Sequence, residues 1–142
     1  MSSPLDNLCG PGKALREEPP DKQEFAGLNR SGRKRLTDAQ NQSNSLEGRF
    51  DLAYNAAHAM CRAALRWHGY RSANRFLVFQ LLPHSLGLGP EVWRVLAKCH
   101  ELRNLGEYQG DLEVEERIVM DLIAACEKVE AKVCALAPIQ RN

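Results

Sequence analysis

Residues 45–69 read SLEGRFDLAYNAAHAMCRAALRWHG and carry the strongest helical pattern in the chain. Apolar side chains recur there at steps of three and four, which places them on one face of an α-helix. The positions on this face are Leu46, Phe50, Ala53, Tyr54, Ala57, Cys61, Ala64 and Leu65. Ser45 suits the N-cap, and Gly69 suits the position just past the C-terminal end. We therefore expect a long amphipathic helix with one buried side.

Helical patterns also lie on both sides of this segment. A capping box precedes the first of them, and Pro90 stands at the first helical position of another. Prolines end the short helix and the last helix. The additional helices are expected over about residues 21–41, 72–82, 90–110 and 111–137. No segment has a convincing partner strand, so we predict an all-α fold: an antiparallel four-helix bundle with an additional short helix.

Length and composition fit a single domain. The chain has 142 residues, of which 44% are hydrophobic, and a net charge of +1. We expect a flexible N-terminal segment over residues 1–20, where prolines and glycines interrupt any pattern. A single helical domain over residues 21–138 and a C-terminal tail over residues 139–142 complete the chain. The near-neutral charge argues against bulk coating of nucleic acid, although local basic clusters can still bind it.

Several classes of site and location are disfavoured. The five cysteines include no C-x-x-C pair and mostly fall on apolar faces, which indicates buried thiols in a reducing compartment. We see no signal peptide and no apolar run long enough for a membrane span, so we expect a cytoplasmic protein. No phosphate-binding glycine loop, zinc-ligand spacing or nucleophile elbow occurs. We therefore expect no metal and no cofactor.

Residues 103–108 read RNLGEY and place a cation and an amide in what the pattern predicts to be the last turn of a helix. Arg103 continues the apolar line of this helix, where an unpaired charge costs several kcal/mol to desolvate. The position implies an anionic partner. That partner is either a carboxylate of the fold, for instance Glu47, Asp51 or an acid of the last helix, or the phosphate of a ligand.

These residues resemble a known family motif. Residues 99–133 resemble the HEPN superfamily of small helical bundles, whose hallmark is Arg, a polar residue and then His. Arg103 and Asn104 match this motif, and Tyr108 occupies the place of the histidine. Residues 18–88 resemble a bacterial subgroup of the same superfamily, so the likeness covers most of the chain.

The resemblance implies a homodimer in which two motifs face each other across a cleft. Active members are metal-independent endoribonucleases, and many are toxins paired with an antitoxin, often a minimal nucleotidyltransferase. In that chemistry Arg103 would bind the scissile phosphate, Asn104 would orient it, and a histidine would assist proton transfer at the ribose 2′-hydroxyl. Without that histidine, the alternative is a catalytically inactive dimeric interaction module.

A tyrosine cannot simply replace the histidine, because a phenol has an ordinary pKa of about 10 and is an inefficient base. Tyr108 can donate a hydrogen bond to phosphate, accept a nucleotidyl group from a partner enzyme, or pack over the end of the bundle. His100 is a possible substitute, because it lies one turn before Arg103, about 5 Å away along the helix. The alternative for His100 is a histidine at the edge of the core.

A basic strip follows the end of the helix over residues 45–69. It is formed by Arg62, Arg66, Arg71 and Arg75. Trp67 and Tyr70 are interleaved with these cations, and such a mixture suits single-stranded RNA, whose phosphates and bases are contacted together. The competing interpretation is a solvated charged face.

Overall fold

The computed structural model describes residues 3–10, 12–110 and 114–139, apart from the side chain of Tyr108. The helices are α1 (Pro4–Asn7), α2 (Lys22–Gln40), α3 (Leu46–His68), α4 (Arg75–Gln80), α5 (Leu82–Ser85), α6 (Pro90–Gln109) and α7 (Glu116–Cys134). The strands β1 (Leu15–Glu17) and β2 (Tyr70–Ser72) form the one sheet of the described residues. The fold is therefore mostly helical, as the predicted all-α class requires. Within the described ranges, no helix combines the length and the apolarity that a membrane span needs.

The long amphipathic helix predicted over residues 45–69 is confirmed as α3. The Ser45 side chain accepts a hydrogen bond from the Gly48 amide at 3.0 Å, and this satisfies a donor that the first turn leaves free. Gly69 ends the helix in a left-handed conformation with φ of 90°. The predicted apolar face is buried, with Phe50, Tyr54 and the other core positions of α3 almost fully removed from solvent.

Helix α2 packs closely against α3. Its N-cap is Asp21, whose carboxylate accepts hydrogen bonds from the amides of Gln23 and Glu24. Gly32 faces α3 so closely that an added Cβ would lie 3.1 Å from the backbone oxygen of Ala56. The absence of a side chain at Gly32 thus permits the close approach of the two helices.

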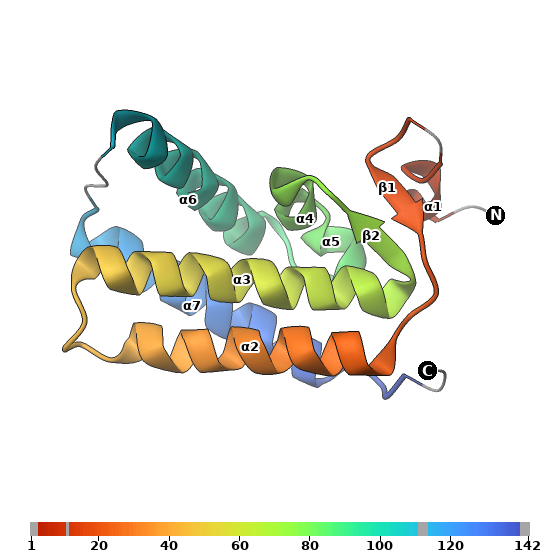
Figure 1. Cartoon of the computed structure of the whole chain (residues 1–142), viewed down its shortest axis with the longest axis horizontal. Helices are drawn as coiled ribbons and strands as arrows, with labels where there is room; N and C mark the ends of the chain where they lie inside the picture. The colour runs from red at the N-terminus through yellow and green to blue at the C-terminus, as the bar shows by residue number, and fades with distance from the viewer. Residues whose placement is uncertain (1–2, 11, 111–113, 140–142) are drawn as a thin grey trace.

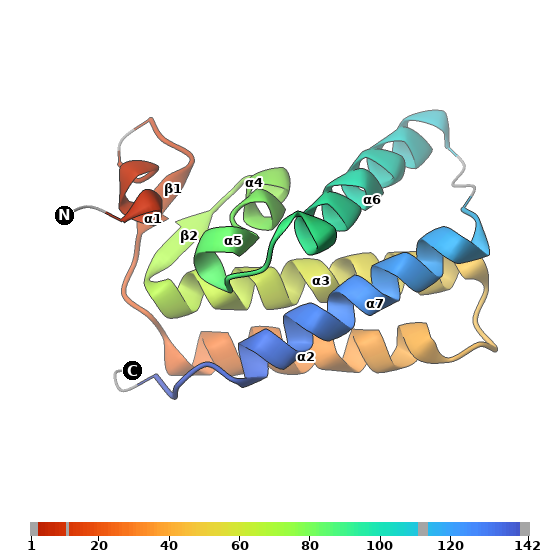
Figure 2. The ribbon, with the colours of Figure 1, turned by 180° about the vertical axis from the view of Figure 1, so that it is seen from behind.

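Helix α3 lies at the centre of the arrangement (Figure 1). It contacts α2 and α7 on one side and α4, α5 and α6 on the other (Figure 2). The two views show that α3 and α7 run in the same direction and that α6 diverges from α3 toward its C-terminal end. Helix α7 begins at Glu116, whereas the start expected for it, Asp111 as the N-cap residue, lies outside the described residues.

The short helix predicted over residues 72–82 is two shorter helices, α4 and α5. We expected Pro83 to end this helix. Instead, Pro83 stands in the first turn of α5. The physical reason is that the first turn makes no use of the backbone N–H that proline lacks. Asn74 caps α4 through its side chain, which accepts a hydrogen bond from the Leu77 amide.

The N-terminal part contains regular structure that its composition did not predict. Strand β1 pairs antiparallel with β2, with Leu15 opposite Ser72 and Glu17 opposite Tyr70. Leu15 is fully buried against the helical core. This sheet, which joins residues more than fifty positions apart, connects the N-terminal segment to the end of α3.

Candidate functional site

The sequence pattern placed Arg103 in the last turn of its helix. In the structure it lies within α6, well before the end of the helix at Gln109. Its side chain is 23% exposed, and the guanidinium carbon stands 4.9 Å from the centre of the Tyr54 ring. Two carboxylates lie nearby: Glu107 at 3.0 Å and, more loosely, Asp51 at 3.8 Å. Both are about 60% exposed, so these pairs are weak and open to competition from another anion.

His100 lies beside Arg103 and takes part in a short chain of polar contacts. Its Nδ1 atom is 2.8 Å from the hydroxyl oxygen of Tyr54, which is fully buried. Its Nε2 atom is 3.1 Å from the amide nitrogen of Asn104. The ring also packs on Phe76 and Phe79, whose centres are 5.4 and 6.4 Å away. The structure therefore brings His100, Arg103 and Asn104 together on one face of α6.

These contacts select one tautomer of His100. An amide nitrogen can only donate a hydrogen bond, so Asn104 donates to Nε2, and the ring proton resides on Nδ1. Nδ1–H then donates to the Tyr54 oxygen. Burial lowers the pKa of His100 below 6.5, and the nearby Arg103 and Arg75 act in the same direction. At neutral pH the imidazole is consequently neutral, with its basic lone pair on Nε2.

A second histidine lies close to this chain of contacts. His58 is on α3, one turn after Tyr54, and its ring packs edge-on against Phe79 at 6.0 Å. Burial lowers its pKa from 6.5 to about 3, and the charges of Arg75, Arg62 and Arg103 contribute in that order. The imidazole therefore lies within the electrostatic reach of three guanidinium groups.

We call this set the cationic cluster. Its members are Tyr54, His58 and Arg62 of α3, Arg75 of α4, and His100, Arg103 and Asn104 of α6. The three helices that supply it contact one another (Figure 1). Burial raises the pKa of the Tyr54 phenol, while the guanidinium groups of Arg75 and Arg103 oppose that rise. Among the described residues, no carboxylate lies within salt-bridge distance of Arg62 or Arg75.

The predicted basic strip divides into two pairs. Arg62 and Arg75 join the cationic cluster, whereas Arg66 and Arg71 bind Glu18 and Glu24. Arg66 is only 2% exposed, which corrects the expectation that it lies on an exposed RNA-binding strip. Its charge is already compensated inside the fold, and Arg71 shares the same two carboxylates.

Tyr108, the remaining predicted site residue, belongs to α6, but its side chain lies outside the described residues. Tyr54 and His58 are the members of the cluster that sequence reasoning missed. Tyr54 was assigned to the apolar face of its helix, and His58 was not singled out. The available signal was their spacing, because positions 54, 58 and 62 are each one helical turn apart.

The described residues offer no obvious metal site. No group of three or more His, Cys, Asp or Glu side chains in these ranges is arranged to hold a metal ion. Burial raises the pKa of the Cys99 thiol to about 12 and raises those of Cys61 and Cys126 as well. These thiols are therefore protonated and unreactive at neutral pH.

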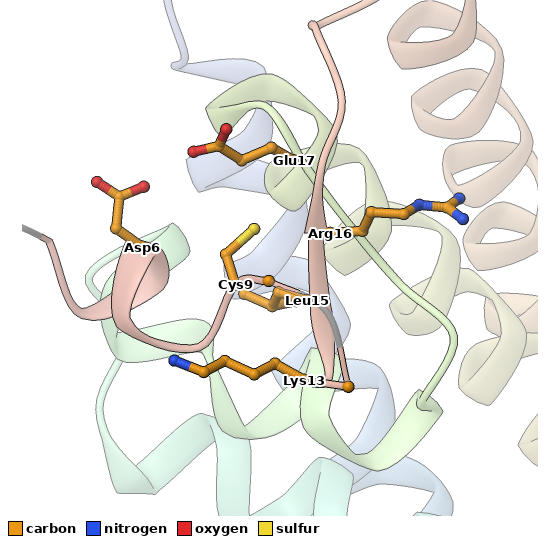
Figure 3. Close-up of a pocket in the computed structure, with 8 residues that line it drawn as sticks. Asp6, Cys9, Lys13, Leu15, Arg16 and Glu17 are labelled. Atoms are coloured by element: carbon orange, nitrogen blue, oxygen red, sulfur yellow. The ribbon is translucent and has the colours of Figure 1, made fainter.

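A separate pocket of about 690 Å³ lies beside α1 and β1 (Figure 3). Its lining includes Asp6, Cys9, Lys13, Leu15, Arg16 and Glu17. The close-up shows the acidic and basic side chains pointing in different directions around it. None of the residues that the sequence singled out for chemistry lines this pocket, so we base the functional argument on the cationic cluster.

In comparisons with known proteins, no family model, no curated protein and no solved structure matches the chain.

Proposed function

We propose that this chain is a HEPN-like RNA-binding protein whose cationic cluster binds RNA phosphate. The observation that carries the proposal is that, besides burial, Arg62, Arg75 and Arg103, from three helices, all lower the pKa of His58, and that Arg75 and Arg103 also lower that of His100. In the same proposal, α2, α3, α6 and α7 correspond to a HEPN-like four-helix bundle. Its support is the order of the long helices and the position of the Arg103–Asn104 pair on the third of them.

The electrostatics of the cluster favour an anion. Positive charges that make a histidine harder to protonate also make a phosphate more stable at the same place. The exposed carboxylates of Asp51 and Glu107 screen the charge of Arg103 only weakly, so a phosphate can compete with them for the guanidinium group. Arg guanidinium groups also offer paired N–H donors that match phosphate oxygens, which favours an RNA backbone over a simple monovalent ion.

The cluster also has the groups for RNA cleavage without a metal. His100 has a neutral imidazole whose Nε2 accepts a hydrogen bond from Asn104. A ribose 2′-hydroxyl in place of that amide could donate its proton to Nε2 as it attacks the adjacent phosphorus. Arg103 and Arg75 would stabilise the negative charge that develops on the phosphate oxygens. We therefore include a metal-independent, toxin-type endoribonuclease activity in the proposal.

Binding of a fluorescein-labelled single-stranded RNA in EDTA, followed by anisotropy, tests the proposal. Arg103→Ala should weaken binding by about tenfold to a hundredfold, since a hydrogen bond to a charged group contributes about 1.5–3 kcal/mol. It should also reduce the salt dependence of log K by about 0.7, as expected for one lost phosphate contact with a single strand. The matched control is Arg94→Ala, because Arg94 is exposed on the opposite side of the same helix.

The same samples test cleavage. An active enzyme should release products with 2′,3′-cyclic phosphate ends in EDTA, and His100→Gln should reduce that rate by about a hundredfold or more. If the wild-type protein does not bind RNA, or if Arg103→Ala and Arg94→Ala bind equally well, the RNA-binding proposal is wrong. If RNA binds and is not cleaved, only the enzymatic part is wrong.

A second candidate is a catalytically inactive HEPN-like dimeric module. It is favoured by two contacts that a ligand would have to replace: the ion pair of Arg103 with Glu107 and the hydrogen bond of Asn104 to Nε2 of His100. This candidate predicts a homodimer in light scattering, no RNA cleavage, and either a gain of activity or no change with Tyr108→His. The antitoxin partner, for example of the nucleotidyltransferase type, belongs to the toxin-type proposal, and we expect the protein in the cytoplasm in both cases.

A further inference from the structure

We infer that His58 is the second imidazole of this site and takes up a proton when an RNA phosphate binds beside Arg62, Arg75 and Arg103. The inference rests on the proposed function and extends it, because it makes RNA binding dependent on pH. Neither the motif nor the basic strip of the sequence includes His58.

The position of His58 singles it out from His100. Both rings pack against Phe79, at 6.0 and 6.4 Å, so imidazoles from α3 and from α6 contact the same aromatic side chain. Both ring nitrogens of His100 are engaged, one by Tyr54 and one by Asn104. Neither ring nitrogen of His58 has a hydrogen-bond partner among the described residues. His58 is thus free to donate a hydrogen bond to a ligand.

The charged groups around His58 determine the direction of the effect. The charges of Arg75 on α4, Arg62 on α3, and Arg103 and His100 on α6 all disfavour the imidazolium form of His58, after burial, which is the largest cause of its low pKa. The carboxylates nearest to the cluster, Asp51 and Glu107, pair with Arg103. A phosphate placed among these guanidinium groups offsets part of their positive potential, and an opposite charge at close range raises a histidine pKa by about 1–3 units. At a pH between the pKa values of His58 in the free protein and in the complex, the complex therefore holds a proton that the free protein lacks.

This proton has a chemical use if the protein cleaves RNA. The 2′-oxygen forms a bond to phosphorus while the bond from phosphorus to the 5′-oxygen breaks. The 2′-hydroxyl gives its proton to Nε2 of His100, and His58 gives its proton to the departing 5′-oxygen. Exchange with water then restores both imidazoles. One neutral and one protonated histidine are the pair that such a transfer requires.

Isothermal titration calorimetry with 2′-O-methyl hexauridylate tests the inference, because this RNA lacks the attacking hydroxyl. Titrations in buffers of different ionisation enthalpy, at about pH 5, give the number of protons taken up per bound RNA. We expect uptake of up to one proton per site, with the dissociation constant rising by up to tenfold per pH unit above that. His58→Phe should abolish the uptake, whereas His84→Phe, at an exposed histidine of α5, should not.

A second measurement needs no variant. In NMR titrations of the wild-type protein, saturating 2′-O-methyl hexauridylate should raise the pKa of His58 by at least one unit from its low value in the free protein. Binding without proton uptake, or uptake that survives His58→Phe, would overturn the role of His58 and leave RNA binding intact. Absence of binding would overturn both.

Discussion

The guanidinium group of Arg66 is buried in the interior, and its N–H groups point at oxygen atoms. Nε donates to Glu24 at 2.7 Å, and the two terminal nitrogens donate to the backbone oxygens of Pro19 and Glu18 at 2.7 and 3.0 Å. A buried cation is tolerated only with such compensation, because its transfer out of water is costly. The side chain therefore connects the end of α3 to the segment that precedes α2.

Replacement of Arg66 by methionine should destabilise the protein strongly. The variant keeps a long side chain but leaves the Glu18 and Pro19 carbonyls without their donors and Glu24 with one cation fewer. A buried acceptor left without its donor costs about 1–3 kcal/mol, whereas Glu18 and Glu24 keep their ion pairs with Arg71. Urea denaturation followed by circular dichroism measures the free energy of unfolding. Arg30→Met, at an exposed arginine of α2, should change it by less than about 0.5 kcal/mol, and equal losses in both variants would contradict this role.

The contrast between Arg62 and Arg66 shows what a sequence conceals at the residue scale. The two arginines are one turn apart on the same helix, so any pattern treats them alike. Arg66 is buried because the segment around Glu18 folds over it, whereas Arg62 remains beside His58. The difference in burial arises from the contact between Arg66 and Glu18, which are almost fifty positions apart, and the local spacing of residues cannot predict such a contact.

At the scale of single elements, two glycines of α2 provide a matched test of helix packing. Gly27 has no atom within 4 Å of a built Cβ, whereas a Cβ on Gly32 would lie 2.5 Å from Cγ of Met60 and 3.1 Å from the Ala56 oxygen. Gly27→Ala should stabilise the protein by about 0.5–1 kcal/mol through helix propensity. Gly32→Ala should destabilise it by about 1–3 kcal/mol, because the backbone oxygen of α3 cannot move aside cheaply.

Thermal and urea unfolding measure the change in the free energy of unfolding for each of the two variants. Opposite signs of the two changes are expected, although the substitution and the helix are the same. If Gly32→Ala is as stabilising as Gly27→Ala, then α2 and α3 do not approach each other as closely as the structure shows.

The elements differ in how well the sequence predicted them. The long helices were predictable because their caps and apolar spacing are local signals: Asp21, Ser45, Gly69 and Pro90 stand where expected. Strands β1 and β2 were missed because each has three residues and their pairing depends on distant segments. The division between α4 and α5 was missed because Pro83 suits the start of a helix as well as its end.

At the scale of the whole molecule, part of the candidate site was predictable from local spacing and part depends on contacts between distant segments. His100, Arg103 and Asn104 share one helix, so their proximity followed from spacing alone. Tyr54 and His58 come from α3, and Arg75 comes from α4. Their convergence with α6 is a property of the tertiary fold, which no single helical pattern specifies. The sequence pattern thus identified the members of the cluster on α6 and missed His58 on α3.

The attachment of the N-terminal segment to the helices should depend on pH. Hydrogen bonding from Arg71 lowers the pKa of Glu18. The pKa of Glu24 also lies below its ordinary value of 4.5, because hydrogen bonds from Arg66 and Arg71 outweigh the effect of burial. A carboxyl group with a lowered pKa in the folded state binds fewer protons there than in the unfolded state. Its stabilising contribution is complete above about pH 4.5 and is lost as the pH falls through the folded-state pKa.

Urea denaturation between about pH 3 and pH 6 measures this contribution. The wild-type protein should lose stability steadily below about pH 4.5, whereas Glu24→Gln should be less stable at pH 6 and lose less on acidification, because one titrating group is gone. Asp38→Asn is the matched control, because Asp38 is exposed on the same helix and forms no ion pair with a described residue. This variant should lose free energy of unfolding with falling pH as the wild type does. Identical pH profiles for the wild type and Glu24→Gln would show that the Glu18, Glu24, Arg66 and Arg71 network does not connect the two parts of the fold. A shallower profile for Glu24→Gln than for the wild type and Asp38→Asn would show that this network contributes to the loss of stability in acid.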